Sequence, residues 1–79
     1  MKYNDETSLD IRLVAEIQDC LRDMIRGNRT TGGALARAKL SGIATALHAL
    51  TGEVWSYQVW PDGWVFVNES ETECISVEL

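Results

Sequence analysis

The stretch from Val54 to Val67, Val-Trp-Ser-Tyr-Gln-Val-Trp-Pro-Asp-Gly-Trp-Val-Phe-Val, has the pattern of a β-hairpin. Aromatic and β-branched residues, which favour strands, stand on both sides of the turn sequence Pro61-Asp62-Gly63. Proline presets the first turn angle, aspartate can bond its own backbone, and glycine accepts a left-handed conformation. We therefore predict two antiparallel strands joined by a three-residue loop.

A three-residue loop also decides which side chains share a face of the sheet. It places Trp60 opposite Trp64, and the next pairs on that face are Gln58 with Phe66 and Ser56 with Asn68. The other face carries the pairs Val59 with Val65 and Tyr57 with Val67. Both faces are partly apolar, and we expect the second one to be covered by helices.

A third antiparallel strand is predicted near the C-terminus, because residues 72–79 alternate between apolar and polar side chains. Ile75, Val77 and Leu79 fall on one side of this strand. The face that we expect the helices to cover then consists of Tyr57, Val59, Val65, Val67, Ile75 and Val77.

Two helices are predicted before the hairpin, over residues 8–27 and 32–50, with Thr7 and Asp10 as a capping box at the first. The apolar side of the first helix consists of Leu13, Ile17, Cys20, Leu21 and Met24. The apolar stripe of the second consists of Leu35, Leu40, Ile43, Leu47 and Leu50. Beside it runs a row of small or weakly polar residues that would let another helix approach closely, Ala34, Ala38, Ser41, Thr45 and His48.

The predicted fold is α+β, with two antiparallel helices packed on a three-stranded antiparallel sheet in the order ααβββ. A chain of 79 residues has room for one domain, here residues 1–79, with a loose N-terminus at 1–6 and a β-meander over 53–79. Domains of this size often supplement a small core by association. We therefore expect a homo-oligomer.

The charges are unevenly distributed along a chain whose net charge is -5. The segment from Thr51 onward has acidic residues and no Lys or Arg, whereas basic residues cluster between Arg22 and Lys39. The acidic half disfavours direct contact with nucleic acid. The absence of a signal peptide or membrane-length apolar run, and two cysteines without metal-ligand spacing, favour a cytoplasmic protein that does not contact a membrane.

The first candidate site is the predicted outer face of the sheet. An exposed cluster of aromatic side chains usually marks a partner surface, and nearby carboxylates would suit a basic target. The predicted partner-binding residues are Gln58, Trp60, Trp64, Phe66, Glu69, Glu71 and Glu73. The alternative is that Trp60 and Trp64 form a cross-strand pair that locks the turn over a helix end.

The second candidate site is the connection between the two helices. Backbone N–H groups at a helix N-terminus, together with arginine side chains, favour a phosphate or carboxylate. The predicted ligand-binding residues are Arg26, Arg29, Thr30, Thr31 and Arg37. The segment Arg26–Gly33 lacks the P-loop pattern and no strand precedes it, so an ordinary helix connection is the alternative.

No catalytic, cofactor or metal site is predicted. His48 is the only histidine, and a general base would need a nucleophile such as Cys20 beside it, which the sequence does not place there. A histidine near a helix C-terminus more commonly interacts with the helix dipole. The carboxylates Glu69, Glu71, Glu73 and Glu78 resemble a solvated strand edge more than a cation site.

In size, acidity and lack of catalytic groups the chain resembles small accessory proteins of phages and mobile elements, such as anti-CRISPR proteins and sponges that sequester nucleotide signals. The resemblance is one of general character. It implies a non-enzymatic inhibitor that binds a host defence protein, which could itself be a basic nucleic-acid-binding protein. The alternative is a homo-oligomeric protein that sequesters a phosphorylated ligand or nucleotide at Arg26–Gly33.

Overall fold

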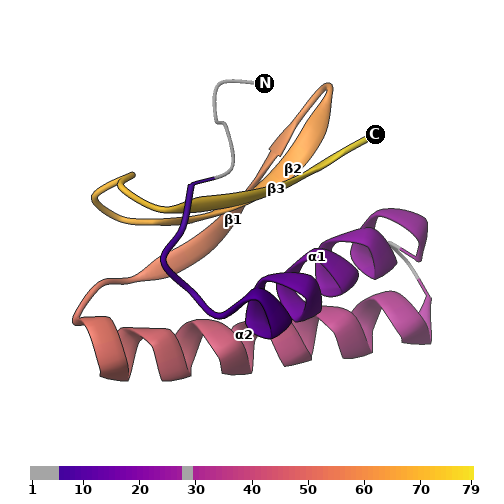
Figure 1. Ribbon diagram of the computed structural model, residues 1–79. Coiled ribbons are helices and arrows are strands. Elements are labelled where there is room, and N and C mark those ends of the chain that lie inside the picture. Colours follow the sequence, from indigo (N-terminus) through magenta and orange to yellow (C-terminus); the bar gives the residue numbers. More distant parts are fainter. Residues whose placement is uncertain (1–5, 28–29) are drawn as a thin grey trace.

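The chain folds into two helices followed by a three-stranded antiparallel sheet in the computed structural model, which describes residues 6–27 and 30–79 (Figure 1). The elements are α1 (Ile11–Arg26), α2 (Thr31–Thr51), β1 (Trp55–Trp60), β2 (Gly63–Asn68) and β3 (Cys74–Glu78). The strand order is β1-β2-β3, and both helices lie on one side of the sheet. This arrangement confirms the predicted α+β fold.

Helix α1 begins at Ile11, later than predicted, because Asp10 is its N-cap. The Asp10 carboxylate accepts a hydrogen bond from the Arg12 backbone N–H at 2.8 Å. The prediction that Thr7 caps this helix is wrong, since the Thr7 hydroxyl accepts from the Leu9 N–H before the helix starts. The buried side of α1 is as predicted and consists of Ile17, Cys20, Leu21 and Met24, with Leu13 partly buried beside them.

Helix α2 begins after the N-cap Thr30, whose hydroxyl accepts from the Gly33 N–H at 3.2 Å, and ends at Gly52 in a left-handed conformation. Its apolar stripe differs from the predicted one, because Leu35 and Leu50 are 67% and 82% exposed. The buried positions are Gly33, Ala36, Leu40 and Leu47. Small residues face α1 here, and they allow the two helix backbones to approach closely.

The β1–β2 hairpin has a register one residue away from the prediction. Trp60 lies opposite Gly63, so only Pro61 and Asp62 form the loop. Gly63 is a strand residue, and it is not among the described residues with a positive φ. The predicted three-residue loop, and the cross-strand pairs derived from it, are therefore wrong.

This shift moves most of the β2 side chains to the opposite face from the one predicted. Phe66 lies between Tyr57 and Ile75 across the sheet, and this row faces the helices. Val65 and Val67, which were predicted to face the helices, lie on the other side. The predicted direction of the side chains is thus correct for β1 and β3 and wrong for β2, although Tyr57 and Val59 of β1 face the helices without being covered by them.

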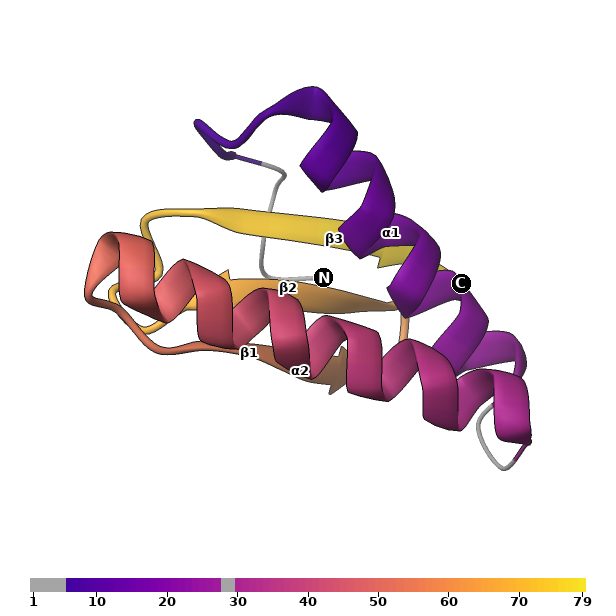
Figure 2. The ribbon, with the colours of Figure 1, turned by 90° about the horizontal axis from the view of Figure 1, so that it is seen from below.

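The core between sheet and helices is formed by residues of all five elements. On the sheet it contains Trp55, Phe66, Ile75 and Val77, and the rings of Trp55 and Phe66 are stacked with centroids 5.5 Å apart. Helix α1 packs on β3 and β2, while α2 packs on β1 (Figure 2). A second, smaller cluster on the opposite face of the sheet contains Val65, Val67, Cys74 and Trp60.

Candidate functional site

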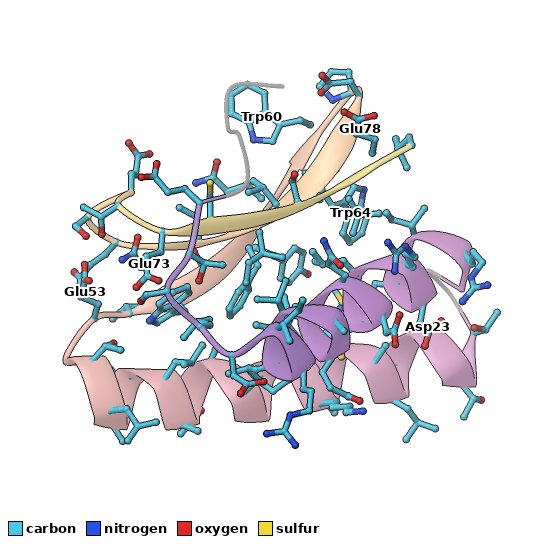
Figure 3. All side chains as sticks on the ribbon, viewed as in Figure 1. Asp23, Glu53, Trp60, Trp64, Glu73 and Glu78 are labelled. Carbon is cyan, nitrogen blue, oxygen red and sulfur yellow. The ribbon has the colours of Figure 1, made fainter. Side chains whose placement is uncertain are left out.

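The structure does not bring the predicted partner-binding residues together on one face. Phe66 is 1% exposed in the core, so it cannot be a surface anchor. Trp64 faces the helices and is half-buried, whereas Trp60 lies on the opposite face, where its indole N–H donates to the Gln58 side chain at 3.3 Å. Figure 3 shows Trp60 and Trp64 on different sides of the hairpin. The predicted aromatic outer face is therefore incorrect.

The predicted glutamates lie at the other end of the sheet from Trp60 and Trp64, around the β2–β3 turn (Figure 3). Glu73 accepts hydrogen bonds from the Ser8 N–H at 2.7 Å and from the hydroxyls of Ser8 and Thr7, both at 3.0 Å. The Ser8 N–H, with smaller contributions from the two hydroxyls, lowers the pKa of Glu73 against the opposing effect of burial. Glu73 therefore holds the N-terminal segment against the sheet.

A buried asparagine organises this turn, which the sequence reasoning did not detect. Asn68 is 1% exposed, and its amide donates to the Glu53 carboxylate at 3.0 Å and to the Thr72 hydroxyl at 2.9 Å. Its side-chain oxygen accepts from the Glu73 N–H at 3.0 Å. Since these bonds satisfy a buried polar group, this cluster is structural. The available signal was a lone polar residue at the end of an apolar strand.

The predicted anion site between the helices is only partly assembled. Arg26 forms an ion pair with Asp23, and both residues line a shallow hollow beside Gly27 and Thr30. A carboxylate in this hollow opposes the binding of an anion. The Thr30 hydroxyl is used as the α2 N-cap, while Thr31 and Arg37 lie exposed on α2. Arg29 lies outside the described residues.

His48 and Cys20 do not form a catalytic pair in this structure. Cys20 is buried in α1, and burial raises the pKa of its thiol, which opposes formation of a nucleophilic thiolate. His48 is exposed near the C-terminal end of α2. Within residues 6–27 and 30–79, no three His, Cys, Asp or Glu side chains gather as a metal site.

An apolar surface remains exposed at the end of the hairpin, on the face that elsewhere forms the core. We call Tyr57, Val59 and Trp64 the hairpin surface. Tyr57 is 37% exposed and Val59 60%, although their cross-strand neighbours Phe66 and Trp64 belong to the core or pack against it. The rings of Tyr57 and Trp64 stack at 5.7 Å with an interplanar angle of 2°. The sheet rises away from the helices at this end (Figure 1), which accounts for the exposure of Tyr57 and Val59.

In β1, the backbone N–H and carbonyl groups of the exposed residues Tyr57 and Val59 also point away from the sheet. The Asn68 backbone N–H donates to the Glu73 carbonyl, and the Leu79 N–H donates to the Asp62 carbonyl. The backbone N–H and carbonyl groups of the even-numbered residues from 62 to 68 therefore point toward β3. The backbone groups of the residues between them, including Val65 and Val67, point toward β1. By the observed register, the outward-facing backbone groups of β1 are those of Trp55, Tyr57 and Val59.

The two edges of the sheet are covered to different extents. At the β3 edge, the Glu6 N–H donates to the Cys74 carbonyl at 3.0 Å, and the Cys74 N–H donates to the Glu6 carbonyl at 2.7 Å. This bridge contradicts the predicted loose N-terminus at Glu6. On the outer side of β1, no strand of the described part of the chain pairs with it.

A hollow lies beside the β1 edge, between the start of this strand and helix α2. We call it the α2–β1 hollow, and its lining consists of Ser41, Ala44, Thr45, His48, Val54 and Trp55. Trp55 is buried at its base, with the indole N–H donating to the Thr51 hydroxyl at 3.2 Å. Four of the lining residues belong to one side of α2, and three of these are in the predicted row of small or weakly polar residues.

Comparisons with protein-family models, curated proteins and solved structures found no match to this chain. Neither described helix is long and apolar enough to cross a membrane. The functional assignment therefore depends on the exposed surfaces of the molecule.

Proposed function

We propose that this is a non-enzymatic protein that binds another protein through the hairpin surface of Tyr57, Val59 and Trp64. The observation that carries the proposal is the exposure of Tyr57 and Val59 on the helix-facing side of the sheet. Apolar side chains that continue a core onto the surface are typical of protein interfaces, where aromatic residues often dominate the binding energy.

An inhibitory role agrees with the small size of the chain and with its resemblance to phage and mobile-element accessory proteins. Such a protein acts by occupying a surface that its target, here proposed to be a host defence protein, needs for its own activity. The glutamates predicted to meet a basic target are less suited to this role. Glu73 is engaged with Thr7 and Ser8, and Glu69 accepts from the Val54 N–H at 2.9 Å at the far end of the sheet.

The proposal is tested by site-specific photo-crosslinking inside the host cell. A photoreactive phenylalanine analogue at Val59 should crosslink to one predominant protein, because this position lies at the centre of the proposed interface. The same analogue at Ala49, which is exposed on α2, is the matched control. Equal and heterogeneous crosslinking from both positions would contradict a specific interface at the hairpin.

Inhibition is then measured on the crosslinked protein after its purification. Adding the unmodified chain should lower the activity of that target in proportion to occupancy, while the Val59→Lys variant should not. If the target binds but keeps its full activity, the protein is a binding protein without an inhibitory role.

A further inference from the structure

We propose that two copies of this chain associate through the side of helix α2 that faces away from the sheet, with the two α2 helices antiparallel and crossing at Gly42. In both views this side of α2 lies on the outside of the molecule, where no described element covers it (Figure 1, Figure 2). We call it the outer face of α2, and it consists of Leu35, Ala38, Gly42, Ala46 and Ala49. The contact does not involve the hairpin surface, so it is independent of the proposed function.

The first supporting feature is the absence of charge on the outer face. Its residues are three, four, four and three positions apart, so they form one stripe over about four turns of the helix. All of them are exposed, and Leu35 is 67% exposed. The exposed side of α1, in contrast, carries the charged residues Arg12, Glu16, Asp19, Arg22, Asp23 and Arg26. An exposed helix side without charge is typical of a surface that another protein covers.

The second feature is a glycine in the middle of α2 that the packing of the described chain does not require. A Cβ atom at Gly42 would meet nothing within 4 Å, and Gly42 is not among the described glycines with a positive φ. Glycine inside a helix lowers stability relative to alanine. A glycine at an exposed position is useful where a second backbone approaches closely. Gly42 therefore marks the crossing point of the two helices.

The third feature is that the outer face is complementary to itself. Its residues lie symmetrically about the central glycine, at four and seven positions on each side. In an antiparallel pair related by a two-fold axis, Ala38 therefore lies beside Ala46 of the second copy, and Leu35 lies beside Ala49 of the second copy. Leu50, which is 82% exposed, follows Ala49 and comes within reach of the same leucine. A second copy thus covers the exposed leucines at both ends of the contact.

The charges beyond the outer face favour the antiparallel orientation of the second copy. The charged residues of α2 are Arg37 and Lys39, both in its N-terminal half, and Lys39 pairs with Glu16 of α1. Helix α1 has equal numbers of acidic and basic residues. The chain beyond the C-terminal end of α2, where Glu53 bonds to the β2–β3 turn, carries the acidic residues Glu53, Glu69, Glu71 and Glu73.

Antiparallel pairing places this acidic end of each copy on the side of the basic half of the other α2. Parallel pairing would instead bring the two acidic ends together and the two basic halves together, which is unfavourable. The molecule therefore supplies both a matching face and matching ends for a second copy of itself.

The first measurement is the mass of the full chain in solution, by light scattering over a range of protein concentrations. We expect the mass to rise to that of two chains and then to stay constant, because a two-fold contact is closed. A mass of one chain at every concentration would overturn the inference. Growth beyond two chains would contradict a closed contact between outer faces.

The contact is located by two arginine variants. Gly42→Arg places a long charged side chain at the crossing point, and the described chain leaves room for it. We expect this variant to be monomeric where the wild type is dimeric, with unchanged circular dichroism. Ala15→Arg, at an exposed position of α1, is the matched control and should remain dimeric. A dimeric Gly42→Arg, or a monomeric Ala15→Arg, would overturn the contact at the outer face.

Gly42→Ala separates association from folding, because its two expected effects have opposite signs. Alanine is the better helix former, so the variant should unfold at a higher urea concentration than the wild type, measured where both are monomeric. Its methyl group lies between the two backbones, and we expect the dimer dissociation constant to rise by about tenfold. A more stable variant that dimerises as tightly as the wild type would show that the backbones do not meet at Gly42.

The orientation is tested by disulfide formation between single-cysteine substitutions, since the native Cys20 and Cys74 are buried. A mixture of Ala38→Cys and Ala46→Cys chains should form a mixed disulfide-linked dimer under mild oxidation. Each variant alone should form little linked dimer. Efficient linkage of Ala38→Cys to itself would indicate parallel helices and contradict the antiparallel pair.

Photo-crosslinking distinguishes this contact from the proposed function. The photoreactive analogue at Ala49 should crosslink to a second copy of the chain, whereas the analogue at Val59 should crosslink to the target. Adding Gly42→Arg should abolish the first crosslink and leave the second. A crosslink from Ala49 to the same host protein as from Val59 would assign the outer face to the target and overturn the second copy as its occupant.

Discussion

The two edges of the three-stranded sheet differ in how they meet the rest of the chain. At the β3 edge, Glu6 pairs with Cys74, and the adjacent Glu73 carboxylate holds Thr7 and Ser8 in place. At the β1 edge, Tyr57 and Val59 are exposed, and no described strand covers their outward backbone groups. The comparison indicates that one edge is closed by the chain itself, while the other remains available for a partner.

The difference follows from how the chain uses its polar and apolar residues. Around the β2–β3 turn, the carboxylates of Glu53 and Glu73 accept hydrogen bonds from Asn68, Ser70 and the N-terminal segment. A network of this kind stabilises the fold because it satisfies buried groups. The open edge has no charged side chain, although charged residues are the usual protection of an exposed strand. Its lack of protection therefore favours a binding role.

The largest expected effect concerns two residues on the same face of the sheet, one buried and one exposed. Phe66→Ala removes a side chain that fills the core between Trp55 and Ile75, and should lower the free energy of unfolding by about 3–5 kcal/mol. Val59→Ala is the exposed control and should cost well under about 1 kcal/mol. Urea denaturation measures both. Similar losses in the two variants would contradict the division into a covered and an uncovered row.

The next effect concerns the polar network at the β2–β3 turn, next to the closed edge. Asn68→Ala leaves the Glu73 N–H and the Glu53 carboxylate without their buried partner, and should cost about 1–3 kcal/mol. Ser56→Ala, at an exposed position of β1, is the control and should be nearly neutral. Urea denaturation of both variants gives the comparison. A neutral Asn68→Ala would mean that the network contributes little to the stability of this turn.

Glu73→Gln should have a smaller effect, of about 1 kcal/mol at neutral pH, because the amide oxygen can still accept from Ser8 without the help of a charge. Since the pKa of Glu73 is lowered in the folded state, its ionisation stabilises the protein above the ordinary carboxyl pKa of about 4.5. This stabilisation is lost as the pH falls through the lowered value.

The difference in unfolding free energy between wild type and Glu73→Gln should therefore be constant at neutral pH and shrink below pH 4.5. Thermal unfolding followed by circular dichroism over this range measures it. Glu78→Gln, exposed on β3, is the control. A difference that grows on acidification would show that the Glu73 carboxylate is not stabilised by Ser8 and Thr7.

Most of the fold could be predicted from the sequence, because it follows from local patterns. The spacing of Ile17, Leu21 and Met24 predicts the buried side of α1, and Thr30 and Gly52 mark the ends of α2. The pattern is less informative on α2, where apolar and small residues occur on several sides. There the position of α1 decides that Ala36 is buried and Leu35 exposed.

The candidate site could not be predicted, because it depends on the length of one loop. Pro61-Asp62-Gly63 is compatible with loops of two or three residues, and one residue of register exchanges the faces of Phe66 and Val65. The prediction therefore placed Phe66 and Trp64 on the outer face. The exposed edge of β1 and the α2–β1 hollow also depend on how the helices and the sheet pack in three dimensions, which local spacing does not reveal.

The smallest effect on stability, and the largest expected effect on function, is at the open edge. Val59→Lys places a charge on a side chain that is already 60% exposed, so the free energy of unfolding should change by no more than about 0.5 kcal/mol. A lysine on an edge strand opposes pairing with another strand, and the proposed partner should no longer bind. Urea denaturation and photo-crosslinking from Tyr57 measure the two effects. Ala15→Lys, at an exposed position of α1, is the control and should change neither. A Val59→Lys variant that unfolds would place Val59 in the core, and one that keeps its partner would make the open edge a surface without a role in binding.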